Sequence, residues 1–315
     1  MRILKPLAQR LLYGLLSLLL VSVVTFWASE QIGDVAVILA GEKASPETVV
    51  RIRHSLGLDQ PAPVRYGRYL NNAVHGDFGM SFHGTHEPVK DIIARDLPMT
   101  ARIAFMAILL SAIVGIFLGT VAGVYQNRFQ DRAVLIVSTL GVTLPNFVLA
   151  PFLVYFFCLK MDRLPQTWEQ NRVAADYMYL ILPVVVLSAR PAALLTRLTR
   201  ASFIDTMQQE YIRLAIAKGV PRMRLIVRHA LRNAILPVVT AIGTSFGFLL
   251  TGSFVVENFF GLPGLGKETI EAISKRDVMV VQACVFVTGA MFIVVNLIVD
   301  ILLPILDPRI REAQI

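Results

Sequence analysis

A glycine-rich segment late in the chain has the spacing of a phosphate-binding loop. Gly261, Gly266 and Lys267 fit the pattern Gly-x4-Gly-Lys, in which backbone amides and a lysine bind phosphate oxygens. The next residue is Glu268, at the position where such loops need a Ser or Thr hydroxyl to hold Mg²⁺. The segment also follows a long apolar run and not a strand. We therefore expect no nucleotide site and no ATPase activity here, and predict a tight re-entrant loop.

Histidines suggest a second kind of chemistry. His83 and His86 are three residues apart, and His75 and Asp77 lie shortly before them. A protein zinc site needs three or four ligands with defined spacing, whereas isolated loop histidines are usually solvated. Because the ligand set is incomplete, we predict no metal site and no cofactor.

A charged residue inside an apolar run is the third candidate. Arg190 lies deep in such a run and is followed by Pro191. A charge at membrane depth costs at least about 2.5 kcal/mol unless it is paired or hydrated. Asp300, late in the last apolar run, is its candidate partner. An Arg190–Asp300 ion pair is the expected arrangement, and contact with a substrate carboxylate is the alternative.

The elements that must position these residues are membrane helices. The chain has 315 residues, of which 55% are hydrophobic and only 17% charged, whereas soluble domains carry about 25% charged residues. About 20 apolar residues cross a hydrocarbon core of about 30 Å. Six runs approach or exceed this length: 11–28, 103–125, 133–159, 179–195, 235–256 and 278–306. The predicted fold class is an all-α integral membrane protein with six transmembrane helices.

The first apolar run has the basic flank of a signal peptide, at Arg2, Lys5 and Arg10. Its apolar stretch is longer than the 7–15 residues of a signal-peptide core, and no small-x-small cleavage site ends it. We therefore expect a retained first helix.

The distribution of basic residues predicts the orientation. With a cytoplasmic N-terminus, segments 1–10, 126–133, 197–232 and 306–315 carry 15 Lys and Arg against 5 Asp and Glu. The opposite segments, 30–98, 159–177 and 257–278, carry 13 against 16. This asymmetry follows the positive-inside rule, so both termini are expected in the cytoplasm. The net charge of +8 needs no nucleic acid to explain it.

Two aqueous segments interrupt the apolar runs. The predicted organisation is an N-terminus and first helix at 1–30, an outer loop domain at 31–98 and a five-helix core at 99–315. Within the outer segment, Ser45-Pro46-Glu47 is typical of a helix start. Gly57 and Gly76 occupy expected helix ends, and residues 88–96 predict a short helix leading into the second span.

Two glycine patterns predict close contacts between helices. Gly115, Gly119 and Gly123 recur every four residues in the second run, and Gly243 and Gly247 do so in the fifth. Small residues at this spacing let helix backbones approach closely in membranes.

The inner segment, 197–235, has the features of a docking element. Ser202 with Asp205 predicts a capped helix start, and Gly219 followed by Pro221 predicts a helix stop. Ala215 and Ala217 keep the end of this helix narrow, so that it fits a partner's groove. The alternative is an ordinary basic loop lying on the lipid surface.

The same segment carries a family resemblance. Glu210 to Gly219, continued by Arg228 to Pro237, resembles the cytoplasmic coupling signature of permease subunits of binding-protein-dependent ABC importers. The long interval between Gly219 and Pro237 is similar to the dipeptide/oligopeptide/nickel branch. Segments 56–61, 76–79, 261–266, 296–300 and 307–311 also resemble that branch. One departure lies at 31–35, where this chain lacks the prolines of the branch's Pro-Gly-Asp-Pro.

The resemblance implies the type I ABC importer permease fold and a non-catalytic role in a bacterial inner membrane. The chain would form half of a pathway for peptides or similar small solutes, with nickel, glutathione or opine-like solutes as alternatives. The implied partners are a second homologous permease, two ATP-binding subunits, an external binding protein and the lipid bilayer, with no nucleic acid. A stand-alone secondary transporter or channel, which would need no ATP, is the rival class.

The resemblance also implies two sets of site residues. The ATPase-coupling set is Glu210, Tyr211, Arg213, Ala215, Ala217, Lys218 and Gly219. The candidate pathway or gate set is Arg190, Thr244, Ser245, Ser253 and Glu257.

Overall fold

The computed structural model describes residues 4–31, 35–40, 44–55, 57–82, 86–168 and 175–306. This part of the chain is helical apart from turns and one isolated bridge between Met80 and Pro88. The helices are α1 Leu4–Gln31, α2 Val35–Ala40, α3 Pro46–Ser55, α4 Ala62–Val74, α5 Val89–Val124, α6 Phe129–Thr143, α7 Asn146–Val154, η1 Tyr155–Lys160, α8 Asp176–Met207, α9 Glu210–Ala217, α10 Arg222–Arg224, η2 Leu225–Leu231, α11 Arg232–Ala234, α12 Leu236–Gly252, α13 Phe254–Phe260, α14 Leu265–Lys275 and α15 Val278–Leu306.

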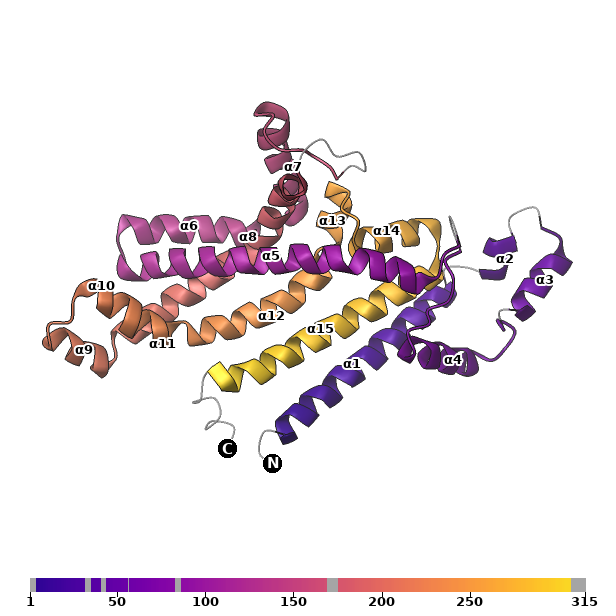
Figure 1. Ribbon diagram of the computed structural model, residues 1–315, viewed down its shortest axis with the longest axis horizontal. Helices are drawn as coiled ribbons and strands as arrows, with labels where there is room; N and C mark the ends of the chain where they lie inside the picture. The colour runs from indigo at the N-terminus through magenta and orange to yellow at the C-terminus, as the bar shows by residue number, and fades with distance from the viewer. Residues whose placement is uncertain are drawn as a thin grey trace.

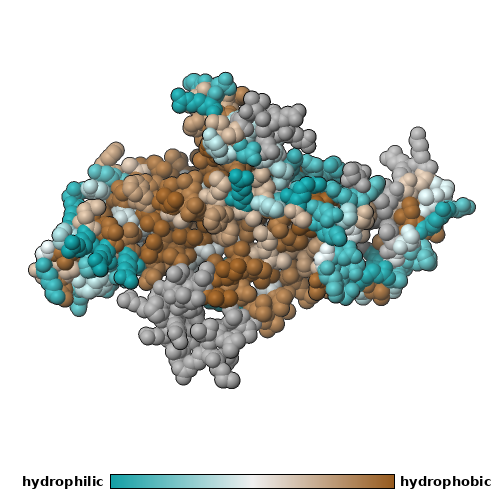
Figure 2. All heavy atoms as spheres, viewed as in Figure 1, coloured by the Kyte–Doolittle hydropathy of each residue, from teal (hydrophilic) through white to brown (hydrophobic). Residues whose placement is uncertain are grey.

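The long helices extend along the long axis of the molecule, as Figure 1 shows. The short helices α2 to α4 gather at one end and α9 to α11 at the other, while α7 leaves the side of the bundle. Figure 2 shows hydrophobic side chains over the middle of this face and hydrophilic ones at both ends. Such a belt is the surface expected of a protein that crosses a membrane.

Four helices are long and apolar enough to cross a membrane: Gln9–Ala28 of α1, α5, α8 and Val278–Ile301 of α15. Two bent pairs bring the number of candidate spans to at most six among the described residues. The six predicted apolar runs are helical, and they give four to six candidate spans. Two of them are not straight helices.

The third predicted span is sharply broken. α6 and the continuous α7–η1 segment meet at an angle of 107°. Pro145 causes the break, because it has no N–H for the carbonyl of Gly141 and its ring disfavours a helical Leu144. Leu144 is accordingly extended, with φ −75° and ψ 118°. The prediction of one span over 133–159 did not include this change of direction.

The fifth span is bent by 52° between Arg222–Ala234 and Leu236–Thr251. Pro237 lies in the first turn of α12, where its missing N–H costs nothing. The preceding segment contains the π-helix η2. The predicted place of Pro237 at the start of the fifth span is confirmed.

The predicted glycine contacts hold the core together. A Cβ on Gly115 would lie 2.6 Å from Cβ of Leu195, and one on Gly119 would lie 2.5 Å from the carbonyl oxygen of Thr196. Real Cβ atoms essentially never approach so closely, so only glycine lets α5 lie against α8. The pattern in α12 works in the same way, because a Cβ on Gly243 would meet Val299 of α15 at 2.2 Å.

The outer segment folds much as its turn signals predict. Ser45 Oγ accepts a hydrogen bond from Thr48 N at the start of α3, and Gly57 and Gly76 adopt positive φ at helix ends. The expected short helix at 88–96 is not separate, since α5 continues without interruption from Val89 to Val124. Buried Asp277 joins this segment to α15 by accepting hydrogen bonds from Ser81 Oγ and Phe82 N.

Candidate coupling and translocation sites

The candidate coupling element is α9, at the end of the molecule opposite α2 to α4 (Figure 1). The predicted start at Ser202 and Asp205 is wrong, because both residues lie inside α8, which runs to Met207. The chain breaks only at Gln208 and Gln209, and α9 then begins at Glu210. Tertiary packing of Phe203, which is 1% exposed, outweighs the local capping signal and keeps α8 helical.

The end of α9 matches the prediction. Gly219 has φ +73°, the left-handed conformation that closes a helix and that glycine adopts without steric cost. Gly219 N donates to the carbonyl of Ile216 and Val220 N donates to that of Ala215, over 2.9 and 3.1 Å. Pro221 follows with its φ near −58° and prevents the helix from continuing.

α9 has one face against its own chain and one face free. Ile212 and Ala215 are buried against α8 and η2, in a cluster with Phe203, Leu225, Ala230 and Ala234. Six members of the predicted coupling set are exposed: Glu210, Tyr211, Arg213, Ala217, Lys218 and Gly219. Only Ala215 points inward, at 9% exposure.

The structure adds apolar residues that the sequence reasoning missed. Leu214 and Ile216 are 56% and 55% exposed, although α9 lies at a polar end of the molecule (Figure 2). Together with Tyr211 they form an exposed apolar surface, which is a candidate docking surface. The helical spacing of Ile212 and Ala215 assigns them to the inner face, and this pattern leaves Leu214 and Ile216 outside.

A buried ion pair near α9 was also not predicted from the sequence. Arg200 Nε and Nη2 donate to the two carboxylate oxygens of Asp131 over 2.5 and 2.7 Å. Asn127 N donates to Asp131 as well, over 2.8 Å. The Asp131 side chain is 2% exposed and that of Arg200 22%. The pair joins the first turn of α6 to the last third of α8, close to the point where the chain turns into α9.

At the other end, the glycine-rich loop is closed by a carboxylate of its own chain. Glu257 is fully buried, and its Oε2 accepts a hydrogen bond from Gly266 N over 2.7 Å. Leu265 N donates to Thr100 Oγ1 of α5 over 2.9 Å. The amide group that would bind phosphate is thus occupied by Glu257, which supports the prediction that this loop binds no nucleotide.

The same packing explains why two positions of this loop are occupied by glycine. A Cβ on Gly264 would lie 2.4 Å from Glu257 Oε2, and one on Gly266 would lie 2.5 Å from Cα of Phe254. Glu257 Oε1 has no hydrogen-bond partner among the described residues. The loop therefore packs tightly around this one side chain.

The predicted ion pair between Arg190 and Asp300 is wrong. Asp300 forms its salt bridge with Arg10 of α1. Helix α1 packs against α15, and it therefore supplies the cation for Asp300.

Family comparison agrees with this geometry. Residues 115–312 match the family described as binding-protein-dependent transport system inner membrane component. Residues 3–104 match its N-terminal region. The chain belongs to this permease family. It is thus a non-catalytic membrane component of an ABC importer, and the rival class of a stand-alone transporter or channel is set aside.

Two relatives cover the permease almost from end to end. It is 39% identical over 305 residues to the glutathione transport system permease protein GsiC of Shigella flexneri serotype 5b, covering 96% of this chain and 97% of the relative. It is 38% identical over the same length to GsiC of Escherichia coli strain K12, with the same coverage. The solved structure of an amino acid ABC transporter with histidines superposes with a TM-score of 0.52 at 17% identity, over 70% of this chain and 94% of that one. The last likeness concerns the fold alone.

The candidate pathway residues of the permease differ in exposure. Arg190 and Thr244 are exposed, whereas Ser245, Ser253 and Glu257 are buried, at 7%, 0% and 0% exposure. The hydroxyl of Thr244 donates within its own helix, to the carbonyl of Ala241 over 3.1 Å. Of the two charged members of the set, Arg190 is exposed and Glu257 is buried.

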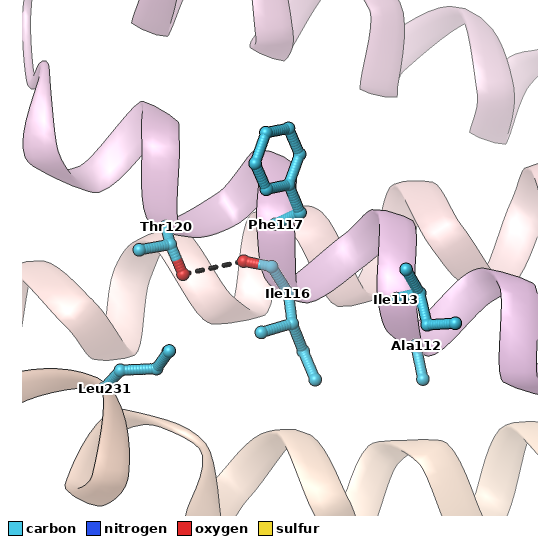
Figure 3. Close-up of a pocket in the computed structure, with 6 residues that line it drawn as sticks. All are labelled: Ala112, Ile113, Ile116, Phe117, Thr120 and Leu231. Atoms are coloured by element: carbon cyan, nitrogen blue, oxygen red, sulfur yellow. Dashed lines mark hydrogen bonds between the residues drawn. The ribbon is translucent and has the colours of Figure 1, made fainter. Parts of the chain in front are cut away.

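An apolar groove of about 340 Å³ lies along α5 and is shown in Figure 3. Its lining is Ala112, Ile113, Ile116, Phe117, Thr120 and Leu231. The one hydroxyl, on Thr120, already donates to the carbonyl of Ile116 over 2.7 Å. With no charge and no free hydroxyl in its lining, the groove lacks the groups that select a peptide-like solute.

The predicted histidine candidates do not form a metal-binding cluster within the part of the permease that the structure describes. His86 Nδ1 donates to the carbonyl of Ser81 over 3.2 Å, and His83 lies outside the described residues. Near the glycine-rich loop, burial and the nearby carboxylates of Asp96 and Glu271 raise the pKa of Glu268. Arg95, which bonds Glu87 and Asp96, offsets part of this charge.

Proposed function

We propose that this permease imports peptide-like solutes, with glutathione as the first candidate. The observation that carries the proposal is the identity of 38–39% to glutathione permeases over nearly the whole chain. In relatives this similar, the membrane pathway retains its architecture, so a solute of the same chemical class is the natural cargo. Peptides, nickel and opine-like solutes are the alternatives within the branch.

The complex that this function needs contains a second homologous permease, two ATP-binding subunits and an external binding protein. Each bent pair is proposed to cross the membrane once, which makes six spans in a type I permease fold with residues 31–98 as an outer domain. α9 supports the docking of an ATP-binding subunit through Tyr211, Leu214 and Ile216, all of them exposed. Gly219 ends this helix before the basic segment 222–232 begins.

Reconstitution tests the proposal. The chain, purified with the permease, ATP-binding subunits and binding protein encoded beside it, is placed in liposomes and supplied with labelled glutathione or a labelled tripeptide. Uptake is expected to be saturable and to require both ATP and the binding protein. Uptake that persists without ATP would contradict the proposal, and uptake of only one solute would define the cargo.

A cysteine-labelling experiment tests the orientation. Both native cysteines, Cys158 and Cys284, are buried, so the measured labelling comes from the added cysteine. Lys267→Cys is expected to react with an impermeant thiol reagent added to intact cells, because the re-entrant loop is proposed to lie outside. Lys218→Cys, at the end of α9, is the matched control and should react only in inside-out vesicles. The reverse pattern would invert the proposed topology.

A further inference from the structure

Arg190 lies near the middle of α8 and far from both of its ends. The helix runs from Asp176 to Met207, so Arg190 is about 21 Å from one end and about 26 Å from the other at 1.5 Å per residue. The apolar run that contains Arg190 ends at Leu195, so Arg190 lies inside the predicted span, about 8 Å from its end at 1.5 Å per residue. Its charge therefore needs water or an anion at membrane depth.

No residue that the structure describes neutralises this charge. Arg190 is exposed, and it has no salt bridge with any residue that the structure describes. Asp300, the expected partner, is bound to Arg10. An anion for Arg190 must therefore come from outside the described residues.

The break between α6 and α7 lies at the same level. A Cβ on Gly141 would be 3.1 Å from the carbonyl oxygen of Ala189 and 3.1 Å from Cβ of Ala193. The last turn of α6 thus touches the residue directly before Arg190. Beyond that turn, Thr143 and Pro145 are exposed. Broken backbone is tolerated at membrane depth only against protein or a water-filled cavity, so this side of the bundle does not face lipid.

The arm formed by α7 and η1 supports the same conclusion. It leaves α6 at 107° and ends at Lys160, Asp162 and Arg163, all exposed. Figure 2 shows hydrophilic side chains at the tip of this arm, beyond the apolar side of the bundle. A charged tip cannot lie in hydrocarbon, so the end of this arm is aqueous or covered by protein.

We propose that Arg190, beside the α6–α7 break, is a contact site on the water-filled pathway for a carboxylate of the transported solute. This inference rests on the proposed import of peptide-like solutes, which carry at least one carboxylate. A guanidinium binds a carboxylate through two parallel hydrogen bonds, and it stays protonated at any physiological pH. Arg190 selects for the anionic group of the solute, while the external binding protein delivers it.

The first test is accessibility. Arg190→Cys, in a chain with Cys158 and Cys284 replaced by alanine, is assembled with its partners and treated with the anionic reagent sulfonatoethyl methanethiosulfonate. The introduced thiol is expected to react, and glutathione delivered by the binding protein should slow that reaction. Val185→Cys is the matched control, because Val185 is also exposed, at 38%, but on another face of α8; it should react at least tenfold more slowly. A thiol that is shielded in the assembled Arg190→Cys complex would mean that the second permease covers this position, and would overturn the proposal.

The second test is transport. Arg190→Gln is expected to lower glutathione uptake at least tenfold, with the same yield of assembled complex. A tenfold loss corresponds to about 1.4 kcal/mol of binding free energy. Uptake by Arg190→Lys should stay within about threefold of the wild type. Modification of the Arg190→Cys variant with a trimethylammonium reagent should restore uptake, and the sulfonate reagent should not. Normal uptake in Arg190→Gln, or loss of assembly, would overturn the inference. If the wild-type complex itself takes up no glutathione or tripeptide, the proposed function fails instead.

Discussion

Replacing Arg200 with methionine is expected to destabilise the permease by about 3–5 kcal/mol, the usual cost of leaving one member of a buried ion pair alone. The stranded group would be the carboxylate of Asp131, whose side chain is 2% exposed. Its remaining hydrogen bond in the described structure, from Asn127 N, cannot replace two charge-assisted bonds from a guanidinium. Arg200→Met should therefore lower the midpoint of thermal inactivation in detergent strongly.

The double variant distinguishes an ion pair from two independent contacts. Asp131→Leu with Arg200→Met removes both charges and should be more stable than Arg200→Met alone, because an unpaired buried charge costs more than an apolar contact. Arg197→Met is the matched control: Arg197 is exposed on the same helix, and its loss should change stability by no more than about 0.5 kcal/mol. Additive effects of the two single substitutions would contradict the pairing.

Gly219→Val is expected to uncouple the ATP-binding subunits from this chain. A β-branched residue at φ +73° costs about 1–2 kcal/mol in the left-handed conformation, so the end of α9 should fray. No atom lies within 4 Å of a Cβ built on Gly219, which excludes a steric clash as the cause. A loss of 1–2 kcal/mol corresponds to about five- to thirty-fold weaker binding, measured as co-purification of the ATP-binding subunits.

Gly219→Asn is the control for this prediction. Asparagine tolerates the left-handed conformation at helix ends, and its side chain also projects into open space. It should retain most of the co-purified subunits, and binding-protein-stimulated ATP hydrolysis should follow the same order as binding. Equal loss in both variants would show that side-chain size, and not backbone conformation, matters at this position.

Arg200 and Gly219 lie in one continuous part of the molecule. Asn233 Nδ2 donates to Tyr211 Oη over 2.7 Å, and Ile212 is fully buried, so α9 is held against the start of the fifth span and the end of α8. Arg200 in turn ties α8 to α6. If an ATP-binding subunit docks on α9 as proposed, its movement would reach α6, α8 and α12 through direct contacts.

Local signals in the sequence were sufficient for the membrane character and for several helix ends. Hydropathy alone located the spans, since the length of an apolar run reflects the thickness of the bilayer. Gly219, Gly57 and Gly76 could be assigned to helix ends because the left-handed conformation depends on a single residue. The close contacts of Gly115 and Gly119 followed from their spacing, although the identity of the partner helix, α8, did not.

Only the tertiary structure decided which distant groups meet. Asp131 and Arg200 are 69 residues apart, and neither residue carries a local sign of the other. Asp300 pairs with Arg10 and not with Arg190, because the packing of α1 against α15 brings these two charges together. The predicted helix start at Ser202 and Asp205 was wrong, because burial of Phe203 in α8 outweighed a capping preference of about 1 kcal/mol. Pro145 could be recognised from the sequence as a helix breaker. The direction of the helix that follows depends on what that helix packs against. This direction also decides whether the region beside Arg190 is exposed.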